Sequence, residues 1–132
     1  MIALDTNILV RFLVRDDKNQ AQLVYARFKQ AEEKGERFLI PLLVVLETLW
    51  VLESVYDPGR SNILSAIEDL MHMPILEFEA DDIVTGFMTQ GRESKIDLSD
   101  LLIACSAQSA GSDSLLTFDK KASRYPFFQL LK

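Results

Sequence analysis

Short apolar runs alternate with longer helical patterns along this chain. The apolar runs lie at residues 2–4, 37–40, 74–78, 114–117 and 127–130. The helical patterns between them cover residues 7–14, 17–34, 41–56, 61–73, 81–91 and 99–110. Gly35, Pro41 and Gly111 support these boundaries, because glycine commonly ends a helix and proline suits its first position. Strands that alternate with helices predict an α/β fold with a mainly parallel sheet. The runs "MIAL" and "SLLT" are continuous, which predicts strands buried on both faces.

Length and composition predict a single domain, 1–132. The chain has 132 residues, of which 48% are apolar and 26% charged, and such a chain can bury a core without disulfides or a structural metal. Cys105 is the only cysteine, which excludes an intrachain disulfide and a cysteine zinc cluster. No apolar run reaches the roughly 18 residues of a membrane helix, and we see no secretory signal pattern. We therefore expect no membrane association and a cytoplasmic location.

The chain is acidic, with a net charge of −6 and a pI near 4.7. Proteins that coat nucleic acid are usually basic, so the charge argues against that class. It does not argue against a nuclease, because clustered carboxylates that hold divalent cations make a site acidic while the cations attract phosphate.

Two acids follow strands whose carboxyl ends a parallel sheet would bring to one edge. Asp5 follows the run 2–4 directly, and Asp119 comes two residues after Thr117. Ligands of such sheets bind beyond the carboxyl ends of the strands. Each acid also has a structural explanation, because Asp5 can cap the helix that begins near Asn7, and Asp119 can stabilise a turn.

Glu47 interrupts the most apolar segment of the chain. It is the only ionisable residue between Arg37 and Glu53, and a helix that is apolar on nearly every face is expected to be largely buried. A buried carboxylate is costly unless it is paired, hydrogen-bonded or metal-bound. The alternative is that Glu47 reaches water along a narrow polar stripe with Thr48.

Asp97 and Asp100 lie at the start of a predicted helix. Ser99 is a suitable N-cap, which puts Asp100 in the first turn, where the helix dipole favours an acid by about 0.3–1 kcal/mol. If the helix begins earlier, Asp97 and Asp100 share one face. Acids gathered at one edge repel one another, and a hard cation such as Mg²⁺ or Mn²⁺ relieves that repulsion. Such a site can support cleavage of a phosphodiester.

Four stretches resemble the PIN-domain ribonucleases, and in particular the VapC-type toxins of bacterial and archaeal toxin–antitoxin pairs. They are "ALDTNILVRFL", "IPLLVVLETLWVL", "DLSDLLIACSAQSAG" and "LLTFDKKAS", in the family's order and at its usual spacing. The resemblance implies a PIN-like three-layer α/β/α sandwich, whose central, mainly parallel sheet has four or five strands flanked by helices. The family's catalytic and metal-binding acids fall on Asp5, Glu47, Asp100 and Asp119. Its accessory positions fall on Thr6, Asn7, Asp97 and Thr117.

The resemblance also implies an activity and partners. It implies a ribonuclease that depends on Mg²⁺, or on Mn²⁺, and cleaves RNA to leave a 5′-phosphate and a 3′-hydroxyl. It implies a homodimer and a cognate VapB-like antitoxin that covers the site, with operator DNA reached only through the antitoxin. Candidate contacts to the RNA backbone are Arg11, Arg15, Lys95, Lys120, Lys121 and Arg124. A solvated surface is the alternative role for each of these basic residues.

The remaining reactive or aromatic residues have structural explanations. His72 lies near a helix end, and the chain has no nucleophile elbow of the form G-x-S-x-G. Cys105 lies in an apolar helix and is expected in the core. Trp50 is expected in the core or in a dimer surface. Phe12, Leu13, Tyr25 and Phe28 can form either core or a groove for an antitoxin helix.

Other functional classes fit the motifs less well. A response-regulator receiver needs an acidic pair after its first strand, and a haloacid-dehalogenase phosphatase needs D-x-D, whereas this chain has D-T-N. Two alternatives stay open within the resemblance. One is a PIN-domain nuclease of RNA processing outside a toxin–antitoxin pair. The other is a non-catalytic PIN-like interaction module, although none of the family's acids is missing here.

Overall fold

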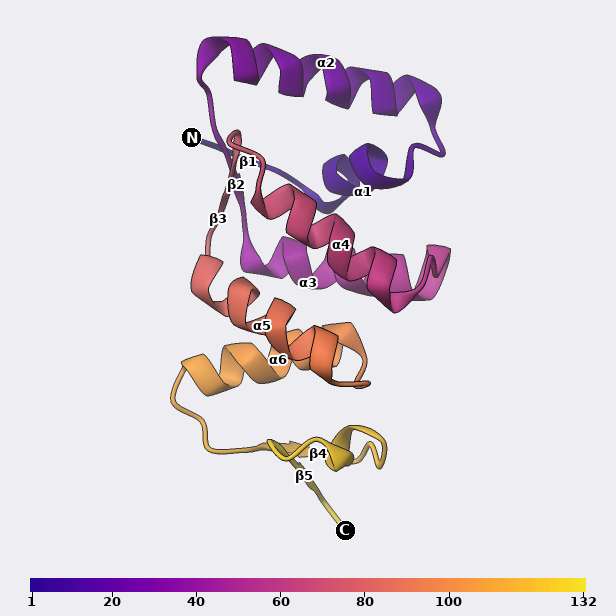
Figure 1. Cartoon of the computed structure of the whole chain (residues 1–132), viewed down its shortest axis with the longest axis vertical. Helices are drawn as coiled ribbons and strands as arrows, with labels where there is room; N and C mark the ends of the chain where they lie inside the picture. The colour runs from indigo at the N-terminus through magenta and orange to yellow at the C-terminus, as the bar shows by residue number, and fades with distance from the viewer. The chain divides into compact units, whose positions relative to one another are not determined.

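The computed structural model describes all 132 residues, which form two compact units, Met1–Ala80 and Asp81–Lys132 (Figure 1). The elements of unit 1 are β1 (Ile2–Ala3), α1 (Thr6–Val14), α2 (Lys18–Lys34), β2 (Phe38–Ile40), α3 (Leu42–Val51), the π-helical turn η1 (Leu52–Tyr56), α4 (Arg60–Met71) and β3 (Leu76–Phe78). Those of unit 2 are α5 (Asp81–Glu93), α6 (Leu98–Ser109), β4 (Leu115–Thr117), the 3₁₀ turn η2 (Ala122–Arg124) and β5 (Phe128–Leu130). None of the helices is long and apolar enough to cross a membrane.

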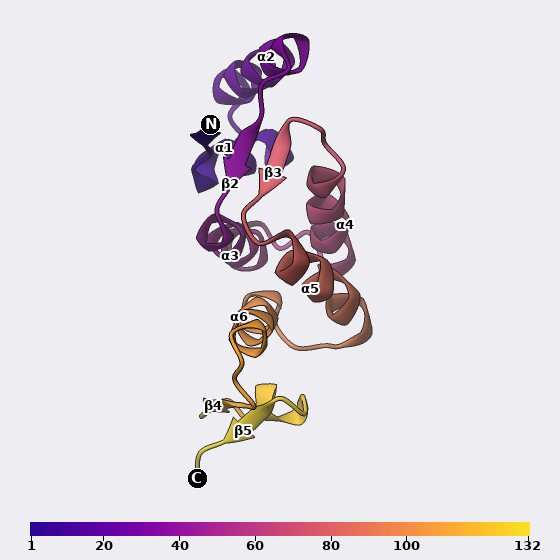
Figure 2. The ribbon, with the colours of Figure 1, turned by 90° about the vertical axis from the view of Figure 1, so that its left-hand side faces the viewer.

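Unit 1 is built on a parallel sheet with the strand order β1-β2-β3. Phe38 of β2 lies opposite Ile2 on one side and Leu76 on the other. The central strand is the most buried, because Phe38 and Ile40 are covered by neighbouring elements. Figure 2 shows β2 and β3 side by side, with α4 next to β3.

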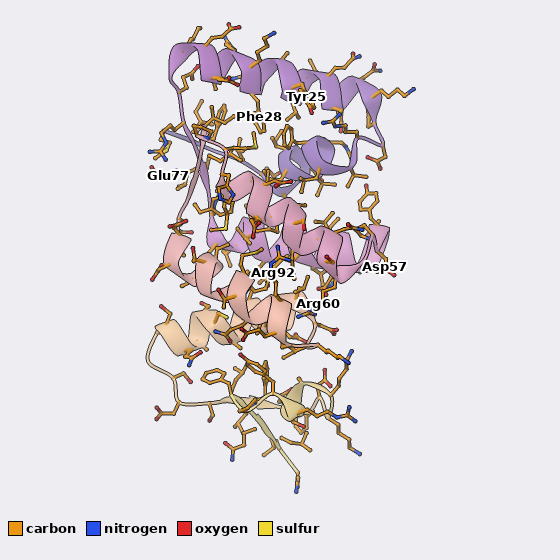
Figure 3. The ribbon with its side chains drawn as sticks, in the orientation of Figure 1. Tyr25, Phe28, Asp57, Arg60, Glu77 and Arg92 are labelled. Carbon is orange, nitrogen blue, oxygen red and sulfur yellow. The ribbon has the colours of Figure 1, made fainter.

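The two N-terminal helices pack through an aromatic cluster. Helix α2 buries Ala21, Val24, Phe28 and Ala31, which recur at helical spacing. The ring of Phe12 on α1 lies 5.3 Å from that of Tyr25 and 5.1 Å from that of Phe28. Tyr25 and Phe28 extend from the side of α2 that faces α1 (Figure 3). Helix α2 ends as predicted at Gly35, which has a φ of +69° that favours glycine.

Unit 2 combines a helix pair with a small parallel sheet. Helices α5 and α6 pack against each other, and Phe87, Leu98 and Leu101 are fully buried. In the sheet, Leu115 of β4 pairs with Phe128 of β5. The hydroxyl of Tyr125 donates a hydrogen bond to Oε1 of Gln90, which ties the end of η2 to α5.

The predicted α/β class with parallel strands is confirmed, and helices alternate with all five predicted strands. Two details differ from the sequence-based expectation. The segment 41–56 is not one α-helix, because Pro41 is the N-cap of α3 and the last turn is π-helical. The strands β1 and β4 are not buried on both faces, since Ile2 is 57% and Leu116 is 60% exposed. These side chains point out of the plane of their sheets, and no other element of the same unit covers them.

Candidate active site

Thr6 connects two of the acids that the sequence singles out. The N–H of Leu4 donates to the carbonyl of Leu39 over 2.9 Å, so the β ladder continues to the residue before Asp5. Asp5 is the N-cap of α1, and its Oδ1 accepts a hydrogen bond of 2.8 Å from the N–H of Thr6. The hydroxyl of Thr6 donates to Oε1 of Glu47 on α3. A buried residue, 5% exposed, therefore holds both carboxylates near the carboxyl end of β1.

The environment predicted for Glu47 is wrong, because its side chain is exposed. The outward residues of α3 are Leu43, Glu47 and Trp50. The buried residues are Val45, Thr48 and Leu49. The polar stripe with Thr48 is wrong too, because the Thr48 hydroxyl is buried and donates to the carbonyl of Val44 over 2.7 Å. Neighbouring elements cover only one side of α3, and Glu47 lies on the other side, where water can solvate its charge. Its carboxylate is positioned by the hydrogen bond from Thr6.

Glu79 positions the helix that carries Glu47, a role that was not predicted from the sequence. Pro41 gives α3 no side-chain cap. Instead Oε1 of Glu79 accepts a hydrogen bond of 2.8 Å from the N–H of Leu42, while the N–H of Glu79 donates to the carbonyl of Ile40 over 3.0 Å. Glu79 thus joins the end of β3 to the start of α3. An acid directly after an apolar strand was the available signal, but the sequence does not show which helix it caps.

Asp97 and Asp100 lie at the start of α6. The helix begins at Leu98, so Asp97 occupies the N-cap position that was predicted for Ser99. Asp100 is then in the first turn, where its charge is favoured by the helix dipole. The Nζ of Lys121 lies 3.8 Å from Oδ1 of Asp97. Because α6 begins before Ser99, Asp97 and Asp100 lie on the same side of its N-terminal end.

Asp119 closes the turn that follows β4. Its N–H donates to Oγ1 of Thr117 over 3.0 Å. Its Oδ1 accepts hydrogen bonds from the N–H groups of Lys121, at 2.9 Å, and Ala122, at 3.2 Å. The structural explanation for Asp119 is therefore correct, and it does not exclude a ligand role for the exposed carboxylate.

The structure thus brings together Asp5, Thr6 and Glu47 in unit 1, and Asn7 follows Thr6 in the first turn of α1. In unit 2 it brings together Asp97 with Lys121 and Thr117 with Asp119. Neither unit by itself gathers three His, Cys, Asp or Glu side chains as a metal-holding group. The donor chemistry still fits a hard divalent cation, because a neutral threonine positions the exposed carboxylates of Asp5 and Glu47 without cancelling their charge.

Two of the predicted RNA contacts are engaged within unit 1. Arg11 forms an ion pair of 3.1 Å with Asp16 and donates to Gln20 over 2.6 Å. A hydrogen bond from Tyr56, together with the charge of Arg11, lowers the pKa of Asp16. Arg15 stacks on the ring of Tyr25 at 4.5 Å and donates to its hydroxyl. Arg11 and Arg15 therefore contribute to the packing of α1 on α2.

The other basic candidates lie on the surface of unit 2. Lys95, Lys120 and Arg124 are exposed, and Lys121 is exposed beside Asp97. These four side chains can reach a phosphate without breaking a packed contact of the core. Of the predicted RNA contacts, the four in the C-terminal unit are therefore the ones not engaged in packing.

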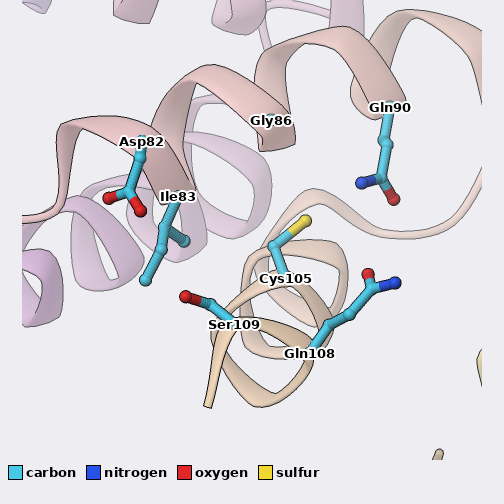
Figure 4. A pocket seen from close by; sticks show the side chains of 7 residues that line it. All are labelled: Asp82, Ile83, Gly86, Gln90, Cys105, Gln108 and Ser109. Atoms are coloured by element: carbon cyan, nitrogen blue, oxygen red, sulfur yellow. The ribbon is translucent and has the colours of Figure 1, made fainter. Parts of the chain in front are cut away.

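The candidate acids Asp5, Glu47, Asp100 and Asp119 do not line the following two hollows. A pocket between α5 and α6 is lined by Gln90, Cys105 and Gln108 among others (Figure 4). Burial raises the pKa of the Cys105 thiol, which agrees with its predicted place in the core. In unit 1 a cavity of about 540 Å³ is lined by Phe12, Tyr25 and Phe28 together with Met73, Pro74 and Ile75. Of the two roles predicted for these aromatic residues, the structure shows that they line a groove as well as packing together.

Comparison with known proteins gives consistent matches along the chain. A family model described as the PIN domain matches residues 2–128. A curated "VapC ribonuclease" of Aquifex aeolicus (strain VF5) is 21% identical over 127 residues, which cover 96% of this chain and 93% of that protein. No solved structure gives a significant match.

Proposed function

The chain belongs to the PIN-domain family, and on that premise we propose that it is a metal-dependent endoribonuclease that acts as the toxin of a type II toxin–antitoxin pair. The similarity to a VapC ribonuclease along 127 residues supports this assignment. The observation that carries it is the pair of carboxylates, Asp5 and Glu47, that Thr6 holds at the carboxyl end of β1. We treat residues 1–132 as one PIN-like domain acting in the cytoplasm.

Four acids would hold the ion: Asp5, Glu47, Asp100 and Asp119. We propose Mg²⁺, with Mn²⁺ as the alternative, because both prefer carboxylate oxygens and water. When bound, the ion supplies Lewis-acid stabilisation of the charge that develops on the scissile phosphate. The accessory residues would be Thr6, Asn7, Asp97 and Thr117. Thr6 orients Asp5 and Glu47 through the two hydrogen bonds described above, and Thr117 holds the turn of Asp119.

The aromatic groove of unit 1 is our proposed antitoxin site. Its apolar floor contains Phe12 and Phe28, and its rim carries Lys29, Glu32 and Glu33 on α2. An amphipathic helix of a VapB-like antitoxin would place its apolar face in such a groove. We propose a homodimer as the form that the antitoxin neutralises, with operator DNA reached only through the antitoxin.

The test compares purified variants on a labelled RNA. Asp5→Ala and Asp100→Asn should lose cleavage in Mg²⁺ while their circular dichroism spectra stay those of the native fold. The matched control is Asp69→Asn, which removes the same charge from an exposed position on α4 and should cleave normally. Full cleavage by a clean preparation of Asp5→Ala would refute the proposed site.

The toxin role needs its own test. Induction of the wild-type gene should stop growth, and co-expression of the neighbouring small open reading frame should restore it. RNA cleavage without growth arrest or such a partner would favour a PIN nuclease of RNA processing. Absence of cleavage under all metal conditions would favour a non-catalytic interaction module.

A further inference from the structure

Phe118 carries the most exposed large apolar side chain of the protein. It is 80% exposed, and it lies between Thr117 and Asp119, two residues that we place at the active site. A single exposed apolar side chain is ordinary on a protein surface, so the exposure of Phe118 gains meaning only from the groups around it. Those groups are the turn that carries Phe118 and the basic segment that follows it.

The ring projects from a turn that is held by several hydrogen bonds. The N–H of Asp119 donates to the Thr117 hydroxyl at 3.0 Å, and Asp119 Oδ1 accepts from the N–H of Lys121 at 2.9 Å. The carbonyl of Asp119 accepts from the N–H of Ser123 at 3.0 Å. Phe118 is thus presented by a hydrogen-bonded turn, so the backbone around it loses little conformational entropy when a ligand contacts the ring.

The sequence that follows Phe118 and Asp119 is basic. Residues 120–132 contain Lys120, Lys121, Arg124 and Lys132 and no acid, in a chain whose net charge is −6. Lys120 and Arg124 are exposed. Positive side chains next to an exposed aromatic ring are the combination that single-stranded nucleic acid recognises: phosphates pair with the cations and bases stack on the ring.

We propose that Phe118 is a stacking platform for one nucleobase of single-stranded RNA, and that Lys120 and Arg124 contact the adjoining phosphates. This inference rests on the proposed ribonuclease function. Phenylalanine has no hydrogen-bonding group to read a base edge, so the platform fixes the path of the strand beside Asp119 and contributes affinity rather than sequence preference. A base paired in a duplex cannot stack there, which restricts the site to unpaired RNA.

Fluorescence of 2-aminopurine tests the platform directly. Short single-stranded RNAs with 2-aminopurine at successive positions would be titrated into Asp100→Asn, which binds without cleaving. Because stacking tolerates any base, the natural target need not be known. We expect the Asp100→Asn protein, which keeps Phe118, to quench the fluorescence of 2-aminopurine at one position of the RNA. The double variant Asp100→Asn/Phe118→Ala should bind the RNA about 5- to 150-fold more weakly.

The variants separate stacking from simple apolar contact. Phe118→Trp should retain binding and quenching, whereas Phe118→Leu, which is apolar but has no ring, should lose both. The control is Leu116→Ala, which trims a second exposed apolar residue, 60% exposed on β4, and should bind RNA as tightly as its parent. The same sequence in a duplex should give no quenching.

Several results would overturn the inference. Equal binding by the Leu and Trp variants would show an apolar contact without stacking. A Phe118→Ala protein that unfolds, or that changes its oligomeric state, would show that the ring packs against protein. If the wild type cleaves RNA and Phe118→Ala binds and cleaves equally well, this inference fails and the proposed function stands. If the wild type neither binds nor cleaves RNA, the proposed function fails as well.

Discussion

Replacing Thr6 by valine removes one hydrogen bond and keeps the shape of a buried side chain. The Thr6 hydroxyl donates to Glu47, while its backbone N–H, which valine retains, donates to Asp5. The change therefore releases the Glu47 carboxylate and leaves the N-cap of α1 in place. Thr6→Val therefore changes how the proposed metal ligand Glu47 is positioned while it keeps the packing around residue 6 nearly unchanged.

The two expected effects differ in size. A hydrogen bond to a charged acceptor contributes about 1.5–3 kcal/mol, but Glu47 is exposed and water can replace the lost donor, so we expect a loss of about 1 kcal/mol in the free energy of unfolding. Loss of a group that orients a metal ligand typically costs about 10- to 100-fold in metal affinity or activity. Thr6→Val should thus impair metal binding far more than folding.

Thr6→Ser is the matched control. It keeps the hydroxyl and loses one buried methyl group, which costs about 0.8 kcal/mol of stability. Denaturant unfolding should therefore rank the two variants close together, while calorimetric titration with Mn²⁺ should show weaker binding for the valine variant alone. Equal Mn²⁺ affinity in both variants would refute the positioning role of Thr6.

Three further predictions concern other contacts. Glu79→Ala should lower stability by about 0.5–2 kcal/mol, measured by urea unfolding, because the N–H of Leu42 loses its cap; Glu79→Gln, which keeps an acceptor oxygen, should recover most of it. Tyr56 holds the pKa of Asp16 below its ordinary 3.8, so Asp16→Asn should be less stable than the wild type above that pH, and the difference should vanish as acidification protonates Asp16 in thermal melts. Native Cys105 should react slowly with a thiol reagent at pH 8 and rapidly in urea, because burial raises its pKa and restricts access; fast reaction of the native protein would contradict that packing.

The order of elements was predictable because each depends on local chemistry. Alternation of apolar runs with helical spacing identified the strands and helices, and glycine marked the ends of α2 and α6. Asp5 and Asp119 were expected just beyond the ends of strands, and each lies two residues after the last strand residue, Ala3 or Thr117. The structural roles that the sequence suggested for them, an N-cap and a turn, are also confirmed.

What the sequence did not show depended on which surfaces meet in three dimensions. The pattern of α3 is apolar all round, so it could not show that Glu47 and Trp50 face outward while Thr48 is buried. The pairing of Arg11 with Asp16 depends on a chain reversal at Arg15, whose φ is +61°. Likewise, the cap that Glu79 provides joins residues 37 positions apart.

Metal-dependent cleavage at the proposed site is tested most directly with one end-labelled RNA and protein stripped of metal with EDTA. We expect no cleavage after stripping, recovery on adding Mg²⁺ or Mn²⁺, and products with 5′-phosphate and 3′-hydroxyl ends, with Asp5→Ala inactive throughout. Cleavage that persists in EDTA, or products that end in a 2′,3′-cyclic phosphate, would contradict that expectation.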